Sequence, residues 1–178
     1  MKREIIIAGF GGQGVMSVGK TLVEAGMAEG LEVSWVPSYG PEMRGGTANC
    51  HVGISTSPIG APMFTHPTEL IAMNGPSIEK FGPKVAPGGM IFINSSVVTE
   101  KFEREDVSVY YVPCEAIAEE LGNKKAANMV MLGAFLTATG TLKLETVEQM
   151  IHAVFAGAKE KLIPLNIAAL HRGAECVK

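Results

Sequence analysis

Apolar runs and stretches of helical periodicity alternate along the first part of the chain. Ile5-Ile6-Ile7-Ala8 is an apolar run typical of a buried strand, and apolar residues then recur at three- and four-residue spacing from Val15 to Met27. Gly30 ends this predicted helix, and an apolar segment over 31–36 predicts a second strand. The order strand, helix, strand is typical of a sheet with crossover helices.

The middle of the chain predicts four further strands. Apolar and polar residues alternate over 47–54, which indicates a strand with one exposed face, antiparallel to a neighbour or near an edge. Short apolar runs over 70–74, 90–94 and 107–112 predict buried strands. A loop rich in proline, over 55–68, separates the first of these from the strand before it.

The chain beyond Pro113 is predicted to be helical. Helices are expected over 115–121, 129–139, 144–162 and 166–177. We therefore predict an α/β fold with a mostly parallel, twisted sheet and helices on both faces, Rossmann-like, with a helical C-terminal part. A single domain over residues 1–178 suits this length.

A glycine-rich turn joins the first predicted strand to the first helix: Gly9-Phe10-Gly11-Gly12-Gln13-Gly14. Such a turn directs backbone N–H groups and the positive end of a helix dipole at one place, which favours a phosphate or another anion. We expect the first glycine to adopt a left-handed conformation and the second to let a ligand approach the backbone. The third is expected to let the helix pack close to the strand.

The same spacing fits the dinucleotide-binding pattern G-x-G-x-x-G. That site also needs an acidic residue at the end of the second strand, where it holds the ribose. The only acid of that strand, Glu32, stands at its beginning. A nicotinamide dinucleotide site is therefore disfavoured, while another anion site and a purely structural turn both stay open.

A second loop, Ser38 to Gly46, follows the second strand. The guanidinium of Arg44 could hold a carboxylate or phosphate, and the ring of Tyr39 could stack on a planar group. The alternative is a surface ion pair between Arg44 and Glu42. Because both loops follow strand ends, we expect them at the same edge of the sheet. The candidate ligand-binding residues of the two loops are Gly11, Gly12, Gln13, Gly14, Ser38, Tyr39, Glu42, Arg44 and Gly45.

No catalytic residue and no metal ligand is predicted. The four histidines have no partner at metal-ligand spacing, although His66 is the one that we consider for ligand contact. Cys50, Cys114 and Cys176 are widely separated and form no C-x-x-C pair. We interpret them as reduced thiols, with Cys50 in the core, so that this chain alone would hold no iron–sulfur cluster.

Composition narrows the classes of partner. A net charge of −3 disfavours nucleic acid and anionic membrane surfaces. No apolar stretch reaches the roughly 20 residues that span a bilayer, so we expect a cytoplasmic protein. Charged residues make up 19% of the chain, against a typical value of about 25%. This deficit indicates either a surface covered by a partner chain or a compact domain with buried parallel strands.

Three segments together resemble the gamma subunit of 2-oxoacid:ferredoxin oxidoreductases: Gly9 to Val15, Ser38 to Gly46 and Asn128 to Ala134. The resemblance extends over nearly the whole chain. The form Pro-Glu-Met-Arg-Gly-Gly-Thr-Ala-Asn-Cys, which ends at Cys50, is most similar to the 2-oxoglutarate branch, with branched-chain enzymes next and pyruvate enzymes further off.

The resemblance implies that the complex decarboxylates a 2-oxoacid oxidatively, forming acyl-CoA and carbon dioxide and passing electrons to ferredoxin. It implies thiamine diphosphate, Mg²⁺ and 4Fe-4S clusters on alpha, beta or delta partner subunits, with coenzyme A as co-substrate. This chain would help to close the active site, would be inactive when isolated, and could then form a homodimer. The alternative is a stand-alone nucleotide- or dinucleotide-binding module without its own catalysis.

Overall fold

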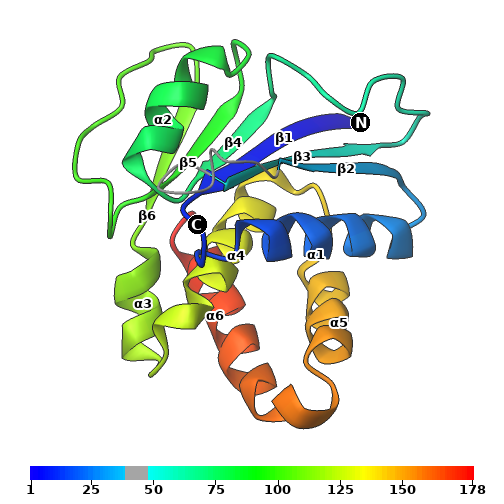
Figure 1. Cartoon of the computed structure of the whole chain (residues 1–178), viewed down its shortest axis with the longest axis vertical. Coiled ribbons are helices and arrows are strands. Elements are labelled where there is room, and N and C mark those ends of the chain that lie inside the picture. Colours follow the sequence, from blue (N-terminus) through cyan, green and yellow to red (C-terminus); the bar gives the residue numbers. More distant parts are fainter. Residues whose placement is uncertain (39–47) are drawn as a thin grey trace.

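A computed structural model describes residues 1–38 and 48–178, and these residues form one twisted six-stranded sheet with helices on both faces (Figure 1). The strands are β1 (Lys2–Gly9), β2 (Glu32–Ser38), β3 (Ala48–Ser55), β4 (Glu69–Ala72), β5 (Met90–Asn94) and β6 (Ser108–Val112). Their order is β2-β3-β1-β4-β5-β6. β1, β4, β5 and β6 are parallel neighbours, whereas β3 is antiparallel to both β1 and β2. The predicted fold class is confirmed.

The helices divide between the two faces of the sheet. The α-helices are α1 (Val15–Ala28), α2 (Gly75–Phe81), α3 (Cys114–Glu120), α4 (Ala127–Thr139), α5 (Leu144–Val154) and α6 (Ile163–Glu175). Short 3₁₀ helices are η2 (Gly82–Lys84), η3 (Lys124–Ala126) and η4 (Gly157–Leu162). Figure 1 shows α2 on one face and α1, α4, α5 and α6 on the other. The helix expected over 144–162 instead ends at Val154, because Gly157 takes a left-handed φ of 76° and a 3₁₀ helix follows.

β1 shows why its sequence is apolar without interruption. Ile5 and Ile7 lie in the larger core under α1, α4 and α6, while Ile6 and Ala8 lie in the smaller core under α2. Successive side chains of a strand point to opposite faces, and both faces of this sheet are covered. The continuous apolar run is thus the signature of an inner strand.

β3 departs from the sequence-based prediction in one respect. It is antiparallel, as expected, but it is an inner strand with both faces covered rather than a half-exposed one. On its polar face Asn49 is 6% exposed, and the ring of His51 lies 4.7 Å from that of Phe64. A Cβ on Gly53 would meet the side chains of Ser34 and Ile59. The prediction of an exposed face was wrong because Ile59 and Phe64, from the loop before β4, cover that face.

A close helix contact joins α4 to α6. A Cβ added at Gly133 of α4 would overlap the carbonyl oxygen of Leu170 and lie 2.8 Å from its carbonyl carbon. A Cβ at Gly173 of α6 would meet the backbone of Val130 in the same way. The two helices therefore approach backbone to backbone through paired glycines, so that α4 is buried on nearly every side.

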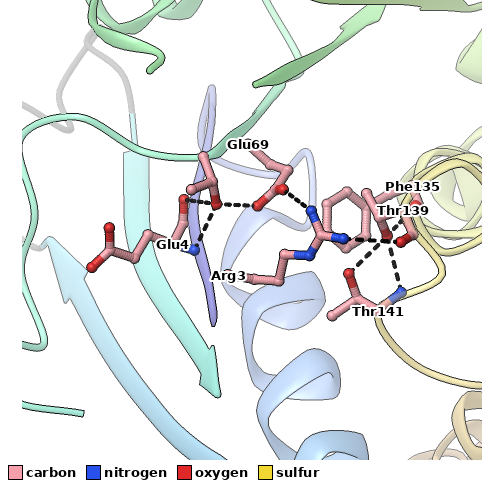
Figure 2. Close-up of polar contacts among 7 residues, drawn as sticks. Arg3, Glu4, Glu69, Phe135, Thr139 and Thr141 are labelled. Atoms are coloured by element: carbon pink, nitrogen blue, oxygen red, sulfur yellow. Dashed lines mark hydrogen bonds and ion pairs between the residues drawn. The ribbon is translucent and has the colours of Figure 1, made fainter. Parts of the chain in front are cut away.

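A buried ion pair ties β1 to β4 and to the end of α4 (Figure 2). Arg3 Nη1 lies 2.7 Å from Glu69 Oε1, and Arg3 Nη2 donates to the carbonyl oxygen of Thr139 at 3.2 Å. The hydroxyl of Thr68 donates to the other oxygen of Glu69. The Glu69 side chain is 1% exposed, and burial raises its pKa. The charge is thus held in the interior by the arginine and one hydroxyl.

Candidate functional site

The glycine-rich turn runs from the end of β1 to the start of α1, but the glycines with a left-handed conformation are not the one that we expected. The left-handed conformations belong to Gly12 and Gly14, with φ of 86° and 76°, and not to Gly9. Gly9 is required by space, because a Cβ there would lie 2.8 Å from that of Met73. Gly11 has open space around it, as a residue that a ligand approaches would. The assignment of the left-handed turn to the first glycine was therefore wrong.

Gly14 brings the turn against α4. A Cβ at Gly14 would lie 2.8 Å from the Cγ of Asn128, the first residue of the third segment that carries the family resemblance. The third glycine was expected to let the helix pack close to the strand, but its close contact is with the Asn128 side chain of α4. Two segments more than 100 residues apart in the sequence thus meet at the carboxyl edge of the sheet.

Gln13 fixes the conformation of the turn. Its Oε1 accepts a hydrogen bond from the backbone N–H of Phe10 at 2.7 Å, and its Nε2 donates to the carbonyl oxygen of Met73 at 3.0 Å. Both ends of the amide are thus bonded to the protein backbone, one within the turn and one after β4. Gln13 positions the turn, and its predicted contact with a ligand stays a prediction.

Gln13→Ala should destabilise the protein by about 1–2 kcal/mol, because two hydrogen bonds are lost and the turn is no longer held to β4. Urea denaturation would measure the change in the free energy of unfolding. The control is Gln149→Ala, which removes an exposed glutamine of α5 whose side chain makes no hydrogen bond within residues 1–38 and 48–178. Equal stabilities of the two variants would contradict the role of Gln13.

The two predicted loops begin at the same edge of the sheet. Both β1 and β2 are antiparallel to β3, so their carboxyl ends lie side by side across it: Gly9 pairs with Ala48, and Ser38 pairs with Asn49. Ser38 is exposed at this edge, and its contact with a ligand stays a prediction. The remaining candidates of the second loop, Tyr39, Glu42, Arg44 and Gly45, lie outside the described residues, and their contacts stay predictions.

Two hollows flank the glycine turn. One of about 290 Å³ is lined by residues 10–12 and 14–17 together with Ala48, the first described residue after the second loop. The other, of about 220 Å³, lies between Gly12 and the region of η3. Its walls include Lys124, Lys125 and Asn128. Gly12 lines both hollows, so the turn forms the ridge between them.

The second hollow combines positive charge with an unused acceptor. Lys124 Nζ lies 3.1 Å from Glu119 Oε1 at the surface, and Lys125 has no acidic partner among the described residues. Glu115 also lines the hollow, and its Oε2 is buried without a hydrogen-bond partner in residues 1–38 and 48–178. The site thus offers ammonium groups to an anion and one carboxylate oxygen to a donor. Sequence analysis missed both lysines; only their position just before Asn128 could have indicated them.

The geometry argues against a dinucleotide at this turn. β3 lies between β1 and β2, so the end of β2 is two strand spacings, about 9–10 Å, from the turn. Glu32 is at the start of β2, at the opposite edge. In open sheets of this kind the ligand binds in the crevice where the strand order reverses, which here lies between β1 and β4. The hydrogen bond from Gln13 to Met73 crosses this crevice. The reading as a dinucleotide-binding module is not favoured.

The cysteines and histidines in the part of the chain that the structure describes have surroundings typical of structural residues. Burial raises the pKa of Cys50 to about 12, and that of Cys114 lies well above its usual value for the same reason. The ring of His66 contacts the carbonyl oxygen of Lys84, before β4 and thus at the edge opposite to the turn. No three metal-ligating side chains gather within residues 1–38 and 48–178. Nor is any helix there long and apolar enough to cross a bilayer.

Residues 4–176 match the protein family described as Pyruvate ferredoxin/flavodoxin oxidoreductase. The chain belongs to this family. The resemblance found in the three sequence segments is thereby confirmed.

Two relatives of this chain differ in how much of their own length it covers. The chain is 45% identical to the ketoisovalerate oxidoreductase subunit VorA of Methanothermobacter thermautotrophicus over 170 residues, which are 95% of this chain and 35% of the relative. It is 35% identical to the 2-oxoglutarate synthase subunit KorC of Methanocaldococcus jannaschii, over 100% of this chain and 95% of the relative. The chain thus spans about a third of the VorA relatives and nearly all of this KorC relative.

Solved structures share the fold. A keto/oxoacid ferredoxin oxidoreductase gamma subunit from Geobacter sulfurreducens superposes with a TM-score of 0.83 at 29% identity, covering 98% of both chains. The 2-oxoglutarate:ferredoxin oxidoreductase of Magnetococcus marinus, solved with 2-oxoglutarate, coenzyme A and succinyl-CoA bound, gives 0.90 at 26% identity. That match covers 99% of this chain and 31% of the other. Both superpositions extend over nearly the whole of this chain.

Proposed function

We propose that this chain is the gamma subunit of a multi-subunit 2-oxoacid:ferredoxin oxidoreductase. In that reaction the bond between the carboxylate and the oxo carbon breaks, carbon dioxide leaves, and the acyl group joins the sulfur of coenzyme A, whose thiol proton is released. The electron pair released passes to ferredoxin. The observation that carries the proposal is the match to a KorC subunit over the full length of this chain, with the glycine turn and the Asn128 segment in contact.

The 2-oxoacid is proposed to be 2-oxoglutarate, on the form of the segment that ends at Cys50 and on the KorC relatives. A branched-chain 2-oxoacid is the second candidate, because the identity to the VorA relative is higher, at 45%. 2-Oxoglutarate has a second carboxylate that the branched-chain acid lacks. A cationic side chain that binds this carboxylate would therefore make the enzyme selective for 2-oxoglutarate.

For this chain itself we propose a contact with coenzyme A at the glycine turn. Coenzyme A carries phosphate groups. The hollow beside Gly12 is lined by two lysines and by the first residues of α4, both of which favour an anion. The unpartnered Oε2 of Glu115 could accept a hydrogen bond from the same ligand. The structure with coenzyme A from Magnetococcus marinus supports this choice of ligand by its similarity to this chain.

The cofactors are proposed to lie on partner subunits. Thiamine diphosphate with Mg²⁺ supplies the carbanion chemistry of decarboxylation, and 4Fe-4S clusters carry the electrons. The described residues of this chain do not fit a cluster, because Cys50 and Cys114 are buried thiols with raised pKa values and no three ligands gather. This chain is instead proposed to close the site and to hold a co-substrate.

The proposal is tested by producing the chain with and without its partner subunits and measuring ferredoxin reduction. The complex should reduce ferredoxin only when a 2-oxoacid and coenzyme A are both present, and the isolated chain should be inactive. Assays with 2-oxoglutarate and with ketoisovalerate decide between the two substrates. Full turnover by the chain alone, or a complex without 2-oxoacid-dependent reduction, would contradict the proposal.

Replacing both lysines of η3, Lys124→Ser with Lys125→Ser, should raise the KM for coenzyme A about tenfold or more, because charge-assisted hydrogen bonds of about 1.5–3 kcal/mol each are lost. The KM for the 2-oxoacid should stay unchanged. The matched control, Lys159→Ser with Lys161→Ser, removes two exposed lysines of the 3₁₀ helix η4. If both double variants have the wild-type KM for coenzyme A, the lysines of η3 do not bind it.

A further inference from the structure

The outer edge of β6 has backbone groups without partners among the described residues. β6 is the last strand of the sheet, and only β5 pairs with it. The N–H of Ser108 donates to the carbonyl of Gly89, and the carbonyl of Val112 accepts from Ser95, both on the β5 side. In a parallel ladder alternate residues bond to one neighbour, so the N–H and C=O groups of Val109 and Tyr111 point away from β5.

The sequence of β6 does not protect this edge. Natural edge strands usually carry charges, proline or bulges that prevent pairing with another strand. The opposite edge strand, β2, has Glu32 and Pro37. β6 reads Ser-Val-Tyr-Tyr-Val and contains none of these. It has the composition of a strand that is covered on its outer side.

A hollow of about 720 Å³ lies beside this edge. It is lined by Val107, Val109 and Tyr111 together with residues 102–105. Tyr111 is 40% exposed, whereas Tyr110, on the opposite face of the strand, stacks on Phe92 at 4.9 Å. A strand added about 4.8 Å beyond β6 would place every second side chain toward this hollow.

The charges around the hollow favour a basic partner. Arg104 is already engaged, because its guanidinium pairs with Asp106 and donates to the carbonyls of Gly82 and Val85. Glu103 and Glu105 are exposed and have no cationic partner within residues 1–38 and 48–178. A second copy of this chain would bring the same two acids to the contact. A segment with lysine or arginine would instead be attracted.

We propose that β6 is a docking strand, and that an extended segment of a partner subunit, bearing lysine or arginine, pairs with it as a seventh strand. The new strand would bond to the outward N–H and C=O groups of Val109 and Tyr111 and place alternate side chains in the acidic hollow. The proposal rests on the proposed function only in requiring that the chain works within a multi-subunit assembly.

Val109→Pro tests the contact directly. It removes an outward N–H and puts a proline ring where the added strand would lie, while the bonds of Ser108 and Val112 to the β5 side remain. Association with the partner subunits should weaken at least tenfold. Val109→Thr keeps the N–H and should associate like the wild type. The pair Glu103→Lys with Glu105→Lys should also weaken association, and the loss should shrink at high salt.

Hydrogen exchange of the unmodified protein provides a readout that does not depend on the fold of a variant. The amides of Val109 and Tyr111 should exchange at least tenfold more slowly in the assembled enzyme than in the isolated chain. Equal exchange in both, or equal association of Val109→Pro and Val109→Thr, would overturn the proposal. Protection in the isolated chain that grows with its concentration would assign the edge to a second copy and would also overturn it.

The two proposals fail separately. An assembled enzyme that reduces ferredoxin with a 2-oxoacid, while the Val109 and Tyr111 amides stay unprotected, refutes the docking strand alone. An assembly that protects these amides, but shows no 2-oxoacid-dependent reduction, refutes the proposed function alone.

Discussion

Gly133→Ala is expected to lower the free energy of unfolding by about 3 kcal/mol. The added Cβ would overlap the carbonyl oxygen of Leu170, and backbone atoms cannot move aside as a flexible side chain can. α4 and α6 would have to separate along their whole contact, and overpacking of this kind costs about 1–3 kcal/mol or more. The better helix propensity of alanine, about 1 kcal/mol, offsets only part of this cost. Thermal or urea unfolding of the purified chain measures the difference.

Gly60→Ala is the matched control for this substitution. Nothing lies within 4 Å of a Cβ at Gly60, and the φ of this residue is not left-handed. The free energy of unfolding of Gly60→Ala should therefore differ from the wild-type value by less than about 0.5 kcal/mol. Gly173→Ala should resemble Gly133→Ala, because its Cβ would meet the backbone of Val130. The double variant should lose less than the sum, since one separation of the helices relieves both overlaps. Wild-type stability of Gly133→Ala would show that the helices can separate at no cost.

Arg3→Ala is expected to cost about 3 kcal/mol, because it leaves the carboxylate of Glu69 buried without its cation. The Glu69 side chain is 1% exposed in the folded protein, so its carboxylate depends on protein groups for its partners. The bond from Arg3 to the carbonyl oxygen of Thr139, which holds the end of α4, is lost as well (Figure 2). Urea denaturation at neutral pH measures the effect.

The pH dependence of the same variant gives a second readout. Burial raises the pKa of Glu69 above its ordinary 4.5, so the folded state binds a proton more tightly than the unfolded chain does. The tighter proton binding by Glu69 therefore stabilises the folded state fully below pH 4.5, and this stabilisation is lost as the pH rises through the raised pKa. Removing the cation raises that pKa further, so the difference in stability between Arg3→Ala and wild type should shrink as the pH falls through the raised pKa.

Glu69→Gln combined with Arg3→Ala separates the charge from the packing. Glutamine keeps the shape of the side chain and removes the buried charge, so the double variant should recover most of the lost stability at neutral pH. If the double variant is as unstable as Arg3→Ala at neutral pH, and if the stability loss of Arg3→Ala does not shrink as the pH falls, the buried charge is not the cause of the loss.

The elements near the glycine turn show how far sequence patterns reach. The apolar run of β1, the turn of Gly9 to Gly14 and the helix α1 were predictable, because each depends on residues close in the sequence. The family was predictable from three short segments for the same reason. The end of α5 was not, because helical periodicity continues past Val154, and the break depends on the conformation of Gly157.

The position of β3 and the walls of the site required the tertiary structure. The alternation over 47–54 predicted an antiparallel strand, but not that Ile59 and Phe64 would cover its polar face. Lys124 and Lys125 join the glycine turn only because η3 returns to the carboxyl edge of the sheet. Neither lysine belongs to a pattern that links it to Gly12.

The sequence by itself thus determined the α/β class, the strand–turn–helix unit at Gly9 to Gly14, and the family, since local periodicity and short motifs carry this information. Only the tertiary structure decided that β3 separates β1 from β2, that Gln13 is bonded to backbone at both ends, and that two lysines face Gly12. These facts depend on which distant segments pack together, and such contacts leave no periodic pattern in the chain.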